Sequence, residues 1–137
     1  MKKITLSFFA LTLVVSAFAQ QLAMNTTSVA HLSTEAAIFN WSITSFDFGK
    51  IKKDQPVTNE FSFTNDGNVP LVITTVQASC GCTVTEYSKD PIAPGEKGFV
   101  KATYNAAKTG SFQKTVTVNA NTEEGVVQLI IKGEVVE

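Results

Sequence analysis

The sequence predicts an all-β protein, an antiparallel sandwich of two sheets built from seven to eight short strands. From Ile38 onward, apolar and polar residues alternate with a period of two, which is typical of half-buried strands. Turn-forming residues interrupt this alternation at short intervals, and no later window sustains a helical repeat for about ten residues. Many short strands with regular turns favour a sandwich, with a small closed barrel as the structural alternative.

The first residues have the features of a secretory signal peptide. Lys2 and Lys3 precede the apolar run ITLSFFALTLVV, and the small residues Ala17 and Ala19 follow it. The run is shorter than the roughly 20 apolar residues of a spanning helix, and no cysteine nearby offers a lipid attachment point. We therefore expect residues 1–19 to be removed, leaving an exported protein, periplasmic or extracellular, without a membrane span.

Composition limits the partners that the remaining 118 residues can bind. This length suits one domain. Nine lysines face 12 acidic residues, a net charge of −3, and there is no arginine. Nucleic-acid binding and polybasic membrane binding both need a basic face, so we expect neither. The one dense cluster, Lys50, Lys52 and Lys53, is interpreted as a solvated turn.

The first part of the processed chain divides into a lead-in and the opening strands. Residues 20–37 lack a sustained period and are predicted to be a flexible lead-in, with His31 solvated, so the domain covers 38–137. Trp41 is expected in the core near the first strand. Phe46 and Phe48 flank Asp47 in a strand that Gly49 is expected to end.

The remaining strands follow the same alternation. In residues 57–65, Phe61 and Phe63 alternate with polar residues to give one apolar face. Pro94 and Gly95 suit the central positions of a type II turn. Turn-rich segments separate the other predicted strands, which are residues 71–76, 83–87, 99–104, 112–119 and 126–135.

Five segments together carry a family resemblance: FDFGKI (46–51), FSFTNDGNVPLVI (61–73), SCGCTV (79–84), DPIAPGEKG (90–98) and GSFQKTVTVNAN (110–121). In this order and spacing the chain resembles the bacterial secreted domain-of-unknown-function family 1573 (DUF1573), which is similar to the immunoglobulin-like modules of the ASPM, SPD-2 and Hydin group. The resemblance covers about residues 44–136 and implies an immunoglobulin-like β-sandwich exported by bacteria, while the family's function is not established.

Both cysteines of the chain lie in one motif, Cys80-Gly81-Cys82-Thr83. In a regular strand the α-carbons of Cys80 and Cys82 would lie roughly 6.6 Å apart. A disulfide needs β-carbons about 3.8 Å apart, so the backbone must bend, and Gly81 is expected to permit the bend. Because the closed loop is so short, the bond would stabilise the fold little and would be easily reduced.

Several roles for Cys80 and Cys82 stay open. The pair could be structural or incidental, could exchange disulfides with a partner protein, or could bridge two chains. Two thiolates could also capture copper(I), which prefers sulfur ligands; no other metal and no cofactor is predicted. No helix follows the motif and no lysine precedes Lys89, so the sequence lacks the usual electrostatic support for a reactive thiol.

Nothing else in the sequence indicates catalysis. The only histidine, His31, lies in the lead-in, and Glu123 and Glu124 fall in a predicted turn. Glycine-rich phosphate loops are absent. We therefore expect no enzyme but a non-catalytic module that binds another envelope protein or its own kind through loops or a sheet edge. The alternative is a redox or copper(I)-handling protein acting through Cys80 and Cys82.

Overall fold

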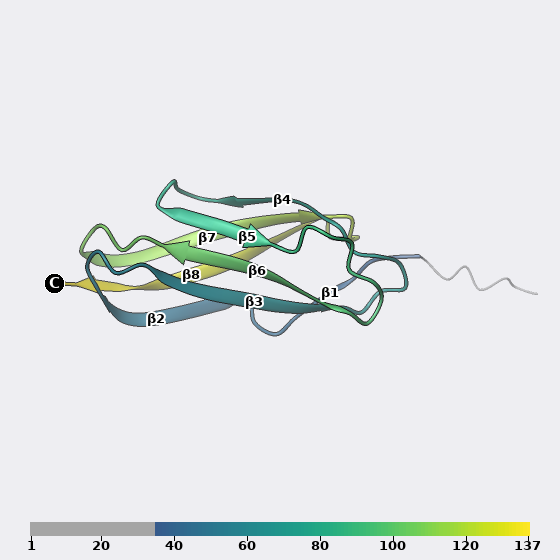
Figure 1. Ribbon diagram of the computed structural model, residues 1–137, viewed down its shortest axis with the longest axis horizontal. Coiled ribbons are helices and arrows are strands. Elements are labelled where there is room, and N and C mark those ends of the chain that lie inside the picture. Colours follow the sequence, from purple (N-terminus) through teal and green to yellow (C-terminus); the bar gives the residue numbers. More distant parts are fainter. Residues whose placement is uncertain (1–34) are drawn as a thin grey trace, which may run out of the picture. The chain divides into compact units, whose positions relative to one another are not determined.

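The computed structural model describes residues 35–137, which form two four-stranded sheets packed face to face (Figure 1). The predicted signal peptide and most of the predicted lead-in lie outside the described residues. No helix in residues 35–137 is long and apolar enough to cross a membrane. The strands are β1 (Phe39–Trp41), β2 (Ser45–Lys52), β3 (Val57–Asn65), β4 (Ile73–Ala78), β5 (Thr83–Tyr87), β6 (Lys97–Tyr104), β7 (Gly110–Ala120) and β8 (Val126–Val136).

The predicted immunoglobulin-like sandwich is confirmed, with one change in strand direction. The strand order is β1-β3-β6-β5 in one sheet and β2-β8-β7-β4 in the other. Every neighbouring pair is antiparallel except β2 and β8, which run parallel. The second sheet is therefore mixed. Its one parallel pair joins β2 to β8, a strand that is distant from β2 in the sequence.

Gly49 does not end its strand as the sequence suggested. The strand β2 continues to Lys52, and its register against β8 shifts between Asp47 and Lys50. Gly49 has a φ of 65°, a left-handed conformation that glycine adopts without steric cost, and its N–H donates to Asp47 Oδ1 at 2.8 Å. The glycine thus forms a bulge that lets the strand continue.

The core between the sheets is built from the apolar faces that the alternation predicted. Phe61 and Phe63 of β3 are 0% and 1% exposed, while Ser62 and Thr64, which alternate with them, are only half-buried. Trp41 packs on this core, with its ring 4.8 Å from the rings of Phe39 and Phe63. The other largest fully buried apolar side chains are Leu71, Val100, Val116, Val118, Leu129 and Ile131.

A buried asparagine fastens the loops at one end of the sandwich. The Asn65 side chain, 0% exposed, donates from Nδ2 to the carbonyl oxygens of Val69 at 2.8 Å and Ile92 at 2.9 Å. Its Oδ1 accepts from the N–H groups of Gly67 at 3.0 Å and Ile38 at 3.3 Å. The side chain therefore replaces the backbone partners that these turns lack.

Contacts of the domain begin two residues before the predicted boundary at Ile38. Ala37 is 1% exposed and pairs with Thr122 in an isolated bridge. The Ala36 N–H donates to Asn68 Oδ1 at 2.9 Å, and the Asn68 N–H donates back to the Ala36 carbonyl at 3.0 Å. The missing side chain of Gly67 allows this close approach, because a Cβ there would collide with the backbone of Ala36 and Ala37.

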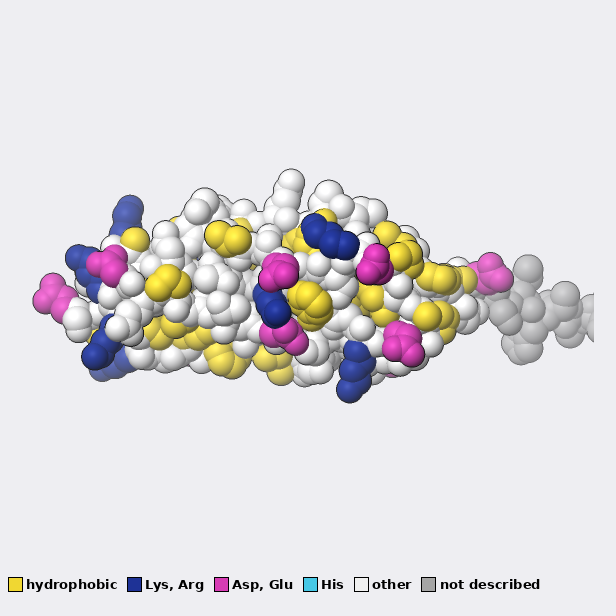
Figure 2. All heavy atoms as spheres, viewed as in Figure 1, with side chains coloured by type: hydrophobic (Ala, Val, Ile, Leu, Met, Phe, Trp, Pro, Cys, Tyr) yellow, Lys and Arg dark blue, Asp and Glu magenta, His cyan; other side chains and the backbone are white. Residues whose placement is uncertain are grey.

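The turns and the surface follow the sequence more closely. The Glu96 N–H donates to the Ala93 carbonyl at 3.0 Å and Gly95 has a φ of 81°, as a type II turn through Pro94 and Gly95 requires. Lys50, Lys52 and Lys53 are exposed, but Lys50 and Lys52 lie within β2, so the predicted turn begins only at Lys53. On the face in Figure 2, lysines and acidic residues are interspersed among uncharged side chains, with no broad patch of one sign.

Candidate functional site at the Cys80–Cys82 turn and the β5 edge

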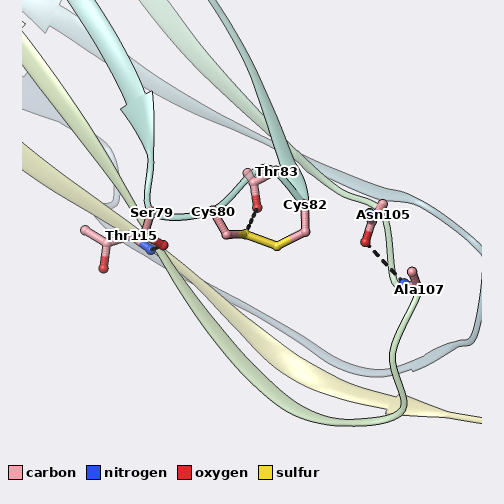
Figure 3. The surroundings of a disulfide bond; sticks show 7 residues. All are labelled: Ser79, Cys80, Cys82, Thr83, Asn105, Ala107 and Thr115. Carbon is pink, nitrogen blue, oxygen red and sulfur yellow. Dashed lines mark hydrogen bonds between the residues drawn. A yellow bond between two sulfur atoms is a disulfide. The ribbon is translucent and has the colours of Figure 1, made fainter.

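The cysteine motif forms the turn by which the chain passes from one sheet to the other. Cys80 follows β4, and Cys82 directly precedes β5 (Figure 3). The two residues form a disulfide across a sequence separation of two, with their α-carbons 5.3 Å apart. This separation is shorter than the roughly 6.6 Å of a regular strand. The backbone therefore bends here, as the spacing of the two cysteines predicted for a disulfide.

The bend does not depend on the special freedom of Gly81. The Thr83 N–H donates to the Cys80 carbonyl at 3.4 Å, which closes a four-residue turn. Neither Gly81 nor Cys82 has a positive φ, and most residue types tolerate such a turn. A Cβ on Gly81 would meet no residue within 4 Å other than its neighbours Cys80 and Cys82. The expectation that glycine permits the bend is thus corrected, because neither the backbone conformation nor the space around the turn requires glycine.

The two sulfurs have different surroundings. Both cysteines are half-buried, but Cys82 packs against the hydrophobic core. Cys80 Sγ lies 3.8 Å from Thr83 Oγ1, and Thr83 is 7% exposed. Because a disulfide sulfur carries no proton, the hydroxyl of Thr83 is the donor in this contact (Figure 3). Cys80 thus has a polar partner that Cys82 lacks.

Hydrogen bonds outside the disulfide hold both ends of the turn. Before it, the Ser79 N–H donates to the Thr115 carbonyl at 2.8 Å, and Ser79 Oγ accepts from the Thr115 N–H at 3.2 Å. After it, the Cys82 carbonyl accepts from the Asn105 N–H at 3.1 Å. The turn is therefore anchored to β7 on one side and to the end of β6 on the other without the sulfur bond.

Within the described residues, no further metal-binding side chains gather around the two cysteines. No cluster of three or more His, Cys, Asp or Glu that could hold a metal occurs within residues 35–137. Copper(I) would need the thiolates of the reduced pair, since a disulfide offers none. The first lysine after the motif, Lys89, instead places its ammonium 3.5 Å from the ring centroid of Tyr87.

The cysteine turn joins two edge strands. β4 ends the order of one sheet and β5 ends the order of the other, and the two strands lie side by side (Figure 1). Hydrogen bonds from Asn105 to Cys82 and from Ser88 to Phe99 fix which residues of β5 face β6. By the alternation of an antiparallel pair, Thr85 and Tyr87 direct their N–H and carbonyl groups away from β6. β5 therefore presents a free edge.

The outer face beside this edge combines an apolar residue with charges. Val84 in β5 is 70% exposed. The next outward residue, Glu86, lies opposite Lys101 of β6, and the Lys101 ammonium is 3.4 Å from a carboxylate oxygen of Glu60. Both side chains of this ion pair are substantially exposed, so it stabilises the fold little. The sequence had not distinguished Val84, because only strand order reveals which strand is at an edge.

Comparison with known proteins identifies a family model that matches most of the described residues. The model of the family described as "Protein of unknown function (DUF1573)" matches residues 39–135. No match was found among curated proteins.

Solved structures share the fold at low sequence identity. A protein of unknown function from Porphyromonas gingivalis has a TM-score of 0.65 and 16% identity, covering 80% of this chain and 51% of its own, so this chain spans about half its length. The human CEP192 PapD-like domain 7 has a TM-score of 0.63 and 8% identity, and the match covers 75% of this chain and 88% of the CEP192 domain. The secreted serine protease VesC of Vibrio cholerae has a TM-score of 0.54 and 14% identity, and the match covers 74% of this chain and 23% of VesC. At these identities the likeness shows the fold alone.

Proposed function

Since the chain belongs to the DUF1573 family, whose name assigns no activity, we propose from its own surface that it is an exported, non-catalytic module that binds another protein of the bacterial envelope. The single observation that carries the proposal is the free edge of β5. Thr85 and Tyr87 direct unpaired backbone donors and acceptors outward there, beside the 70% exposed Val84.

The geometry of this edge suits an extended segment of a partner. A strand added beside β5 would pair with the outward backbone groups of Thr85 and Tyr87, which supply affinity without regard to sequence. Specificity would come from the outer face, where Val84 offers an apolar contact and Glu86 a negative charge. We therefore expect a partner segment with an apolar residue near Val84 and a basic residue near Glu86.

Export and the absence of catalysis are further parts of the proposal. Export is supported by the signal-peptide features of residues 1–19. The VesC protease, which shares the fold, is described as secreted. A non-catalytic role is supported by the sequence, since no histidine occurs after His31 to serve as the base of a nucleophile. The compartment proposed is periplasmic or extracellular.

A photo-crosslinking experiment in cells tests binding at this edge. A photoreactive amino acid replaces Val84 of β5, and in a matched control it replaces Val126, an apolar residue of the interior strand β8 that is 50% exposed. We expect an adduct of defined mass from position 84 and none from position 126. Adding Thr85→Pro, which removes one outward N–H, should abolish the adduct while the protein stays folded.

Two results would contradict the proposal. The first is no adduct at position 84, or adducts of equal yield at both positions. The second is an adduct that persists undiminished with Thr85→Pro, since the contact would then not use the strand edge. An adduct with the mass of two copies would identify the partner as a second copy of this chain in place of another envelope protein.

A further inference from the structure

We propose that the Cys80–Cys82 disulfide is an exchange site, which accepts electrons from a dithiol of a partner protein and returns to the disulfide by the reverse reaction. This activity goes beyond binding at the β5 edge and does not depend on it. The small ring, the exposed position of Gly81 and the unequal surroundings of the two sulfurs support such an exchange site.

The disulfide has little to contribute as a cross-link. It joins residues separated by two positions, so it restricts the unfolded chain much less than a bond that closes a long loop. The turn is also anchored independently, through Ser79 to β7 and through the Cys82 carbonyl to Asn105. Breaking the sulfur bond therefore leaves the β4–β5 connection in place, and the protein can cycle between disulfide and dithiol while folded.

An attacking thiolate has a path to the bond. Gly81 is exposed, and apart from its neighbours Cys80 and Cys82 no residue would lie within 4 Å of a side chain that began there. No other part of the protein therefore covers the turn on this side, and the exposed glycine adds no side chain of its own. Thiol–disulfide exchange needs such access because the attacking sulfur must reach one sulfur of the bond.

The surroundings of the two sulfurs assign their roles. Both cysteines are half-buried, but of the two only Cys82 packs against the hydrophobic core, so a partner has less room to approach its sulfur. Cys80 lies beside the Thr83 hydroxyl, whose hydrogen bond stabilises the thiolate form of Cys80 once the bond is broken. Cys80 is therefore the sulfur that forms the mixed disulfide with the partner. Cys82 is the sulfur that leaves when the partner is oxidised and the sulfur that resolves the mixed disulfide in the reverse reaction.

The exchange balances without any further reagent. A partner thiolate attacks Cys80 Sγ, the bond to Cys82 breaks, and Cys82 leaves with the electron pair and takes a proton from water. The second partner thiol loses its proton and attacks the partner's own sulfur in the mixed disulfide, which releases Cys80 as a thiolate. The partner dithiol has then lost two electrons and become a disulfide, and Cys80 and Cys82 have gained those electrons.

Equilibration with glutathione tests whether the pair exchanges in the folded protein. The purified protein is held in buffers of varying ratio of reduced to oxidised glutathione, the thiols are alkylated, and the intact mass is measured. We expect both forms to be populated across the series, with an unchanged circular dichroism spectrum. A pair that stays oxidised at every ratio, or is reduced only where denaturant unfolds the protein, would overturn the proposal.

Single-cysteine variants test the assigned roles. Cys82→Ser keeps the accessible Cys80, and Cys80→Ser keeps the Cys82 that packs on the core. With oxidised glutathione we expect Cys82→Ser to form the mixed disulfide about ten-fold faster, because thiol reactivity follows exposure and thiolate stability. Equal rates, or a faster Cys80→Ser, would overturn the assignment of Cys80 as the exchanging sulfur.

The contribution of Thr83 has its own matched control. In the Cys82→Ser background, Thr83→Val removes the hydroxyl beside Cys80, while Thr85→Val removes a hydroxyl two residues further along the same face. We expect Thr83→Val to slow alkylation of Cys80 about five-fold at pH 7, as the loss of one hydrogen bond implies, and Thr85→Val to have no effect. An equal effect of both variants would show that Thr83 does not stabilise the thiolate.

Discussion

The Asn65 side chain donates a hydrogen bond of 2.9 Å to the carbonyl oxygen of Ile92, 27 residues later in the sequence. This bond joins the turn after β3 to the segment before β6. Next to it, Leu71 and Ile92 exchange two backbone hydrogen bonds of 2.8 Å each. A single amide thus closes one end of the sandwich, at the opposite end of β5 from the cysteine turn.

Replacing Asn65 should therefore destabilise the protein strongly. Asn65→Ala leaves the carbonyls of Val69 and Ile92 and the N–H groups of Gly67 and Ile38 without their partner. Since an unsatisfied buried group costs about 1–3 kcal/mol, we expect a loss of about 3 kcal/mol in the free energy of unfolding, measured by urea denaturation.

A second asparagine of the same turn provides the control. The Asn68 side chain accepts one exposed hydrogen bond from Ala36, so Asn68→Ala should cost less than about 1 kcal/mol. Equal losses for Asn65→Ala and Asn68→Ala would show that the buried network does not stabilise this end of the sandwich.

Replacement by alanine should affect stability at one glycine and not at another. Gly98 lies opposite Phe63 in the pairing of β3 with β6, and a Cβ there would run into the Phe63 ring. We expect Gly98→Ala to lower the free energy of unfolding by about 1–3 kcal/mol through overpacking. Gly81→Ala meets no atom and needs no unusual φ, so its change should stay within about 0.5 kcal/mol. A larger loss at Gly81 than at Gly98 would contradict this structure of the cysteine turn.

Removal of the disulfide should change stability only modestly. The double variant Cys80→Ser with Cys82→Ser opens a ring between residues two positions apart. The circular dichroism spectrum should stay unchanged. We expect the free energy of unfolding to fall by no more than about 2 kcal/mol, because the stabilisation by a cross-link grows with the loop it closes. Thermal and urea unfolding of the oxidised protein and the variant measure this. Failure of the variant to fold would show that the bond is a structural staple.

The sequence predicted the strands well because side-chain alternation is a local signal. The bounds of β3 and β5 match their predictions, and the apolar face of Phe61 and Phe63 is fully buried. Strand β4 begins two residues later than predicted, because Leu71 pairs with Ile92 outside the sheet. Alternation shows where a strand lies but does not show its partner.

Features that depend on distant pairing could not be predicted in this way. The parallel pairing of β2 with β8 brings together the two ends of the domain, and no local pattern specifies it. The hydrogen bonds of Asn65 likewise join segments that only the folded chain brings together. For the site, the motif located the cysteines, but the free edge of β5 and the exposure of Val84 follow from strand order.

Proline substitutions along β5 distinguish its free edge from its paired edge. Thr85 directs its N–H outward, whereas the N–H of Glu86 points to Lys101 of β6 by the alternation of the pair. Thr85→Pro removes no bond of the sheet, so we expect it to cost less than about 1 kcal/mol. Glu86→Pro removes a bond of the sheet and places the proline ring against β6, so we expect it to cost more than about 2 kcal/mol.

The measurement is urea unfolding of both variants beside the unchanged protein, with amide hydrogen exchange of β5 and β6 as a local readout. Thr85→Pro should leave the exchange of β6 amides unchanged, while Glu86→Pro should speed the exchange of the Lys101 and Thr103 region. The reverse order of the two costs would mean that the register of β5 is shifted by one residue. The outward groups would then belong to Val84 and Glu86, and the surface proposed for the partner would have to be redrawn.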